Sequence, residues 1–219
     1  MNLTLKISDI WKSYNGEDIL KECSFSFNKS GIYVLMGPNG CGKSTFLRIC
    51  ALLEFSERGS VDYFSSQKRL EKDIELKRRI TLILPKVGVF NATVFNNAAY
   101  GLKIRGIAKK EIEERVNEQL EYFGLSHKRT NNALTLSSGE IQRLGIARAM
   151  VTKPDILFLD EPTASVDQKN TEIIEDIILK MKDAGSPTVI MTTHDMLQAE
   201  RLADELLTIK DGRILSSKA

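Results

Sequence analysis

The sequence has little cysteine, no long apolar run and no excess of one charge. Its three cysteines, Cys23, Cys41 and Cys50, have spacings that match neither a zinc site nor a disulfide framework, so we expect reduced thiols in a cytosolic compartment. No apolar run approaches the roughly 18 residues that span a bilayer. Residues 1–9 lack the basic and apolar regions of a signal peptide. The sequence thus predicts a cytoplasmic chain that is neither membrane-spanning nor exported, and that contacts a membrane only through a partner.

Charge is balanced along the chain. Lysine and arginine total 31 and aspartate and glutamate total 29, for a formal net charge of +2. The most basic stretch, residues 68–79, is interrupted by Glu71, Asp73 and Glu75, which favours a solvated helix face. A nucleic-acid interface needs a clustered basic surface, so we expect no nucleic-acid partner.

Two kinds of apolar pattern indicate an α/β fold. Leu3, Leu5 and Ile7 alternate with polar residues, and residues 23–27 do the same, which predicts half-buried strands in an N-terminal antiparallel β layer. Residues 32–36 and 156–159 are continuous apolar runs, as in central strands of a parallel sheet that is covered on both faces. Residues 189–191 could form a third such strand, and residues 209–214 a hairpin.

A helical stretch interrupts this pattern. Ile112, Val116, Leu120 and Phe123 recur at helical spacing on a charged segment, so we interpret them as a buried helix stripe. We predict a single domain over residues 1–219. Residues 1–87 and 151–219 form its α/β core with the β layer, and residues 88–150 form an inserted helical subdomain.

A phosphate-binding loop follows the first apolar strand. Its glycines let backbone N–H groups point at phosphate oxygens, and the helix that follows adds the positive end of its dipole. Lys43 supplies a charge to the β- and γ-phosphates, and the hydroxyl of Ser44 can bind Mg²⁺. We interpret Cys41 as an inert small residue within the loop. The predicted nucleotide-binding residues here are Gly37, Pro38, Asn39, Gly40, Cys41, Gly42, Lys43, Ser44 and Thr45.

An acidic pair follows a second central strand. Asp160 and Glu161 come directly after the apolar run 156–159, at the carboxyl end of a predicted parallel strand, where open α/β sheets bind ligands. Asp160 is suited to hold Mg²⁺ through water. Glu161 is suited to act as the base, or polariser, for an attacking water.

One further segment narrows the class of nucleotide hydrolase, and it reads Leu136 Ser137 Ser138 Gly139 Glu140 Ile141 Gln142 Arg143. This segment resembles the signature motif of the ATP-binding subunits of ABC transporters. Essentially the whole chain follows that family's order of motifs, from an aromatic at Tyr14 to His194. The resemblance implies a P-loop NTPase core, ATP and Mg²⁺ as cofactors, and a head-to-tail homodimer or a heterodimer with a similar ATPase. Each ATP is then held between one protomer's phosphate loop and Ser137, Ser138, Gly139 and Glu140 of the other.

The resemblance also implies roles for single residues. Tyr14 would stack on the adenine, and His194 would contact the γ-phosphate beside Glu161. His194, Glu161 and Lys43 would together form the catalytic set. Asp167 would report the state of one site to the other protomer. Integral membrane permease subunits would be the further partners, with the chain peripheral on the inner face of the cell membrane.

The sequence departs from the family pattern at two positions. Ser138 stands where signature motifs usually have glycine, which places a Cβ and a hydroxyl close to phosphate. Pro85 stands where the family has a glutamine whose amide binds Mg²⁺. Since a proline side chain has neither donor nor acceptor and fixes φ, we expect water to complete the Mg²⁺ shell and the hinge to be stiffer.

Residues 89–103 resemble the segment of importer ATPases that docks a short helix of the membrane subunit, and the likeness is strongest to tungstate and molybdate importers. We expect a docking cleft that includes the side chains of Val89, Phe90, Val94 and Phe95. Three alternatives stay open: an exporter ATPase, a soluble ABC-type mechanical ATPase, and a regulatory module that binds ATP with weak hydrolysis.

Overall fold

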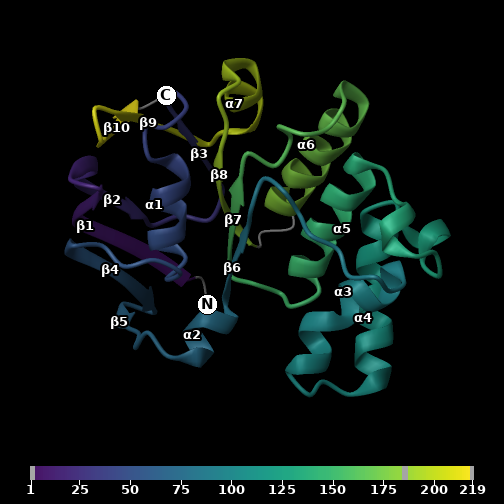
Figure 1. Ribbon diagram of the computed structural model, residues 1–219. Coiled ribbons are helices and arrows are strands. Elements are labelled where there is room, and N and C mark those ends of the chain that lie inside the picture. The colour runs from purple at the N-terminus through teal and green to yellow at the C-terminus, as the bar shows by residue number, and fades with distance from the viewer. Residues whose placement is uncertain (1–2, 184–186, 218–219) are drawn as a thin grey trace.

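Two sheets and a layer of helices make up the molecule, as the computed structural model in Figure 1 shows. The structure describes residues 3–183 and 187–217. Helix α1 (Lys43–Cys50) lies between the sheets, and most of the other helices lie on the far side of the larger sheet. The predicted α/β class, with its antiparallel N-terminal layer and mainly parallel second sheet, is confirmed.

The smaller sheet is antiparallel and has the strand order β2-β1-β4-β5. Its strands are β1 (Leu3–Tyr14), β2 (Glu17–Phe27), β4 (Arg58–Ser65) and β5 (Lys68–Arg69). Leu3, Leu5 and Ile7 point into a core shared with α1 and one face of the larger sheet, as their alternation predicts. This sheet therefore forms one wall around the first helix.

The larger sheet determines where the functional residues meet. Its order is β10-β9-β3-β8-β7-β6, in which β9, β3, β8, β7 and β6 run parallel to one another and β10 is antiparallel to β9. Because β3, β8 and β7 are adjacent, the segments that leave their carboxyl ends start side by side. The strands are β3 (Ile32–Met36), β6 (Ile80–Ile83), β7 (Ile156–Asp160), β8 (Thr188–Thr192) and the terminal hairpin of β9 (Glu205–Lys210) with β10 (Arg213–Ser217).

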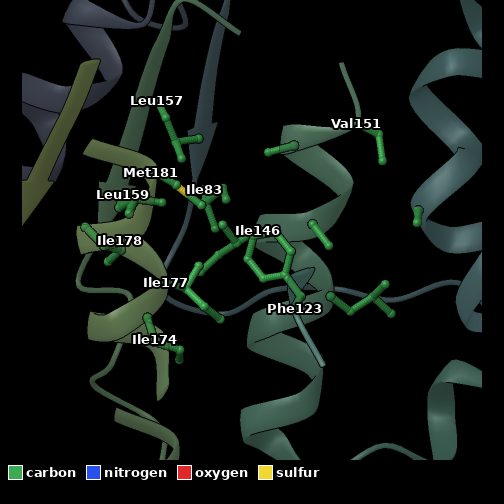
Figure 2. Close-up of a cluster of buried hydrophobic side chains, with 14 of the residues drawn as sticks. Ile83, Phe123, Ile146, Val151, Leu157, Leu159, Ile174, Ile177, Ile178 and Met181 are labelled. Carbon is green, nitrogen blue, oxygen red and sulfur yellow. The ribbon is translucent and has the colours of Figure 1, made fainter. Parts of the chain in front are cut away.

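Helices cover the other face of this sheet. Figure 2 shows Ile146 of α5 and the adjacent Phe123 facing Ile83 of β6 and the side chains of α6. Each fully buried side chain of this size contributes about 1.5–3 kcal/mol through the apolar surface that it removes from water. The helices are α3 (Val94–Ile104), α4 (Lys109–Tyr122), α5 (Ser138–Met150), α6 (Gln168–Asp183) and α7 (Met196–Leu202), with 3₁₀ turns η1 (Ser126–Lys128) and η2 (Ala133–Thr135).

The predicted stripe on α4 is confirmed, since Ile112, Val116, Leu120 and Phe123 are all buried. Helices α3 to α5 fall within residues 88–150, but the division into a core and a separate helical subdomain stays a prediction. In the described part of the chain, no helix is long and apolar enough to cross a membrane.

The basic stretch 68–79 is only partly helical. Helix α2 (Ile74–Arg78) begins where Asp73 accepts a hydrogen bond from the backbone N–H of Leu76. Before this helix, Lys68 and Arg69 form β5, because the edge of β4 is available for backbone pairing. Asp62 on β4 also forms an ion pair with Arg69. The prediction of one helix face was therefore wrong for residues 68–69, although their side chains are exposed as expected.

Candidate nucleotide site

A tight loop connects β3 to α1. Gly42 is the first cap residue of α1 and has φ 104°, which other residues rarely adopt. A Cβ on Gly42 would lie 2.8 Å from the side chain of Leu20, which would have to shift. No side chain caps this helix end. The first N–H groups of α1 are therefore free to bind an anion.

Lys43 is buried within this loop. Its Nζ donates hydrogen bonds to the carbonyl oxygens of Gly37 at 2.7 Å and Pro38 at 3.2 Å, and lies 3.6 Å from Oε1 of Glu161. Only 5% of the Lys43 side chain is exposed. A buried ammonium must be paired, and here loop carbonyls and one carboxylate do so. Phosphate oxygens could replace these partners.

The acidic pair is oriented by a residue that sequence reasoning missed. The hydroxyl of Thr192, at the end of β8, donates to Oδ1 of Asp160 at 2.8 Å and accepts from the backbone N–H of Glu161 at 2.9 Å. Glu161 has φ 45°, an uncommon value for a residue other than glycine. A threonine ending a third parallel strand was the available signal, because adjacent carboxyl ends meet at one edge.

Glu161 lies between two basic side chains. Its Oε2 is 3.3 Å from Nδ1 of His194, while its other oxygen faces Lys43. The His194 side chain is 60% exposed, so it is not a satisfied core histidine. The structure thus brings Lys43, Glu161 and His194 together from three segments that sequence reasoning had placed in one catalytic set.

A cavity of about 520 Å³ joins Lys43 and Glu161 to Tyr14, while His194 lies outside its lining. Its polar end is formed by the phosphate-binding loop and Glu161, and its apolar end by Tyr14 and Ile19. Ile19 was not predicted, since it lies on a strand far from the loop in sequence. The volume falls in the range of small-molecule sites. The loop residues at the cavity wall are Asn39, Gly40, Gly42, Lys43, Ser44 and Thr45.

The predicted signature residues lie elsewhere, because none of residues 137–140 lines this cavity. Ser137 caps α5 by accepting from the N–H of Glu140, and the carboxylate of Glu140 accepts from the N–H of Ser137. This hydrogen bond is the main reason that the pKa of Glu140 lies below its usual value. Glu140 is therefore engaged by its own helix end, while the side chains of Ser137 and Ser138 are exposed.

Asn170 connects the signature to Asp167. A Cβ on Gly139 would lie 2.2 Å from the side chain of Asn170, so any larger residue there would displace Asn170. Asn170 in turn donates its backbone N–H to Asp167 at 2.8 Å and its side-chain amide at 3.0 Å. The backbone hydrogen bond is the largest cause that lowers the pKa of Asp167. The exposed signature and the loop at Asp167 thus form one surface.

The loop after Glu161 is fixed by a buried polar network. Gln198 of α7 donates to the hydroxyl of Thr163 at 3.0 Å and to Glu175 of α6 at 2.9 Å. Arg201 adds two hydrogen bonds to the same carboxylate, and they raise the pKa of its guanidinium. A guanidinium group that forms two hydrogen bonds to one carboxylate fixes the orientation of both side chains. They hold the loop that leaves Glu161 against α6 and α7.

The loop after β3 places a lysine at the start of a helix, where it faces an acidic pair at the carboxyl end of β7 in the same parallel sheet. This arrangement defines the class of P-loop nucleotide hydrolases. Residues 20–164 match the family model described as ABC transporter, and the chain belongs to this family. It is an ATP-binding subunit, and its ATPase activity is coupled to transport.

Individual relatives are similar over nearly the whole chain. The chain is 38% identical to the tungstate uptake system ATP-binding protein TupC of Peptoclostridium acidaminophilum, with 97% of each protein covered. It is 31% identical to the phosphate import ATP-binding protein PstB 2 of Natronomonas pharaonis, covering 97% of this chain and 79% of that protein. Among solved structures, cbiO1 of Clostridium perfringens, described as part of the ABC transporter complex cbiONQ, matches with a TM-score of 0.87 and 25% identity. That match covers 98% of this chain and 88% of the other.

We predict that Thr192→Val slows ATP hydrolysis by about tenfold or more, because it removes the group that orients both Asp160 and Glu161. It also leaves two polar groups unpaired, which costs about 1–3 kcal/mol of folding free energy. Steady-state phosphate release and thermal unfolding measure the two effects.

The matched control is Thr193→Val. Thr193 is also buried, and its hydroxyl accepts from the N–H of Asp195 rather than contacting the acidic pair. Equal slowing by both variants would contradict the role of Thr192 in positioning the acids.

Proposed function

We propose that this chain is the Mg²⁺-dependent ATPase subunit of an importer that takes up a small oxyanion. The observation that carries the ATPase chemistry is Glu161, with one carboxylate oxygen at Lys43 and the other at His194. The substrate class is supported by the similarity to proteins named for tungstate uptake and phosphate import. Both of those names describe tetrahedral oxyanion substrates.

The residues present fit Mg²⁺. Ser44 offers a hydroxyl at the start of α1, and Asp160 offers a carboxylate that is held by Thr192 and 2% exposed. Oxygen donors of this kind suit Mg²⁺, which usually keeps several water ligands. When bound, the ion would neutralise charge on the β- and γ-phosphates. Pro85 offers no side-chain ligand, and no residue of β6 or of the segment after it lines the cavity.

The arrangement supports a stepwise account of hydrolysis. Entry of the nucleotide would draw Lys43 from the carbonyls of Gly37 and Pro38 to the phosphates. That exchange frees one oxygen of Glu161 to accept a proton from the attacking water. His194 would donate to the γ-phosphate while contacting the other oxygen of Glu161. Tyr14 would stack on the adenine at the apolar end of the cavity.

The position of residues 137–140 supports a dimer with shared sites. The exposed side chains of Ser137 and Ser138 lie outside the chain's own cavity, so a second copy, or a similar ATPase, can present this end of α5 to the γ-phosphate. Asp167 lies on the same surface through Asn170, which suits a residue that reports the state of the opposite site.

The chain would reach its membrane partner through a groove between β6 and α5. The groove is lined by Leu84, Val87 and Arg148, among others. Beside it lie Phe90 and Tyr100, each 46% exposed, with ring centroids 4.6 Å apart. A permease segment docked there would hold the chain at the inner face of the membrane. The expectation that Val94 belongs to the cleft was wrong, because Val94 is fully buried in the core where α3 packs against α4 and α5.

We predict that Glu161→Gln binds ATP but hydrolyses it on the order of 100-fold more slowly, because the base is lost while the phosphate contacts stay. ATP with Mg²⁺ should then drive a stable dimer, measured by size-exclusion chromatography with light scattering. A variant that stays monomeric at millimolar ATP would contradict the shared site.

Phe90→Asp is expected to abolish co-purification of a multi-spanning membrane protein from native membranes, because docking needs a desolvated apolar anchor. ATP affinity, measured with a fluorescent nucleotide, should not change. Phe55→Asp is the matched control, since Phe55 is 91% exposed and lies beyond the groove. If both variants retain the membrane protein, Phe90 is not part of the docking surface.

A further inference from the structure

Lys12 and Glu54, which the proposed chemistry does not use, form a polar cluster with Tyr14 at the nucleotide cavity. The hydroxyl of Tyr14 donates to the carboxylate of Glu54. Nζ of Lys12 lies 3.3 Å from the same carboxylate oxygen of Glu54 and donates to the carbonyl of Phe55 at 3.2 Å. The Lys12 and Glu54 side chains are only 16% and 21% exposed. Partly buried charges of this kind need a defined geometry to be stable.

The cluster leaves one face of the Tyr14 ring available. Nζ of Lys12 lies over the ring, 5.1 Å from its centroid, so a cation already covers one face. Tyr14 also lines the cavity, so its opposite face is the one that a planar base can reach. Burial and the hydrogen bond to Glu54 both raise the pKa of Tyr14, and the phenol therefore stays a donor to the carboxylate.

The same cluster ties the ring to the phosphate-binding loop. Glu54 follows α1, and its backbone N–H donates to the carbonyl of Arg48 in the last turn of that helix. Helix α1 itself begins at Lys43. A short rigid path therefore runs from the loop through α1 and Glu54 to the aromatic ring.

We propose that Glu54, supported by Lys12, is a positioning residue that fixes the Tyr14 ring at the distance from the phosphate-binding loop that a nucleoside triphosphate requires. This inference rests on the proposed nucleotide site. Glu54 does not contact the nucleotide, and it acts by holding the ring at which the base binds. Loss of Glu54 then weakens binding of the base while the phosphate contacts stay intact.

The test compares two ligands that share the phosphates and differ in the base. Calorimetry measures binding of a non-hydrolysable ATP analogue and of inorganic tripolyphosphate to the full chain. Glu54→Ala is expected to weaken the ATP analogue about threefold to tenfold, the worth of one hydrogen bond, and to leave tripolyphosphate binding unchanged. Glu54→Gln, whose amide oxygen can still accept from Tyr14, should restore most of the affinity.

Two further variants separate positioning from general packing. Tyr14→Phe removes the hydroxyl, so adding Glu54→Ala to it should cause little further loss of affinity for the ATP analogue. Glu57→Ala is the matched control, because Glu57 accepts its hydrogen bonds from the backbone and hydroxyl of Ser13 rather than from Tyr14. It should lower the unfolding temperature without changing the ratio of the two affinities.

The outcomes are distinct. Equal weakening of both ligands by Glu54→Ala would mean that Glu54 supports the loop as a whole, and unchanged affinity for the ATP analogue would mean that the ring needs no such support. Either result overturns the inference. A wild-type chain that binds the ATP analogue no better than tripolyphosphate would instead count against base stacking on Tyr14, and so against the proposed nucleotide site itself.

Discussion

The site depends on how one buried ammonium group is neutralised. Lys43 lies almost out of solvent, and its charge is met by the carbonyls of Gly37 and Pro38 and by Glu161. Such a charge is tolerated only where its partners are held in place. Thr192 and the parallel order of β3, β8 and β7 hold Glu161 there. A triphosphate that attracts Lys43 therefore also alters the surroundings of the acidic residue, and binding and chemistry are linked through one ion pair.

A second link extends from this ion pair to the molecular surface. The loop after Glu161 is fixed through Thr163 and Gln198 to the pair of Glu175 and Arg201, and it leads to Asp167. Asp167 holds Asn170, which packs against the signature helix at Gly139. Rigid contacts of this kind can carry a change in occupancy to a neighbouring subunit, provided that the surface has two arrangements. The exposed surface of residues 137–140 is where the proposed account locates that neighbour.

Much of the fold followed from local patterns in the sequence. The central strands are continuous apolar runs, and the loop 37–44 carries its chemistry in consecutive residues, so both could be predicted. Contacts between distant segments could not be. Thr192 reaches back to Asp160, and Glu54 reaches Tyr14, across separations that no periodicity reports. Val94 was expected in the docking cleft because it lies in the segment that resembles a docking segment, yet its side chain is buried at the start of α3. The pairing of Lys68 and Arg69 with β4 likewise depends on an edge that only the folded sheet provides.

Sharing of ATP between two chains is tested most directly by a disulfide that joins the phosphate-binding loop of one chain to the signature segment of the other. Cys23 and Cys50 are buried, so a Cys41→Ser chain that also carries Asn39→Cys and Ser138→Cys has two exposed thiols, one on the loop and one on the signature. With Glu161→Gln to retain the nucleotide, mild oxidation should give a cross-linked dimer in the presence of ATP and Mg²⁺, and little without them. Absence of the dimer at every ATP concentration, or an equal yield without ATP, would contradict the shared site.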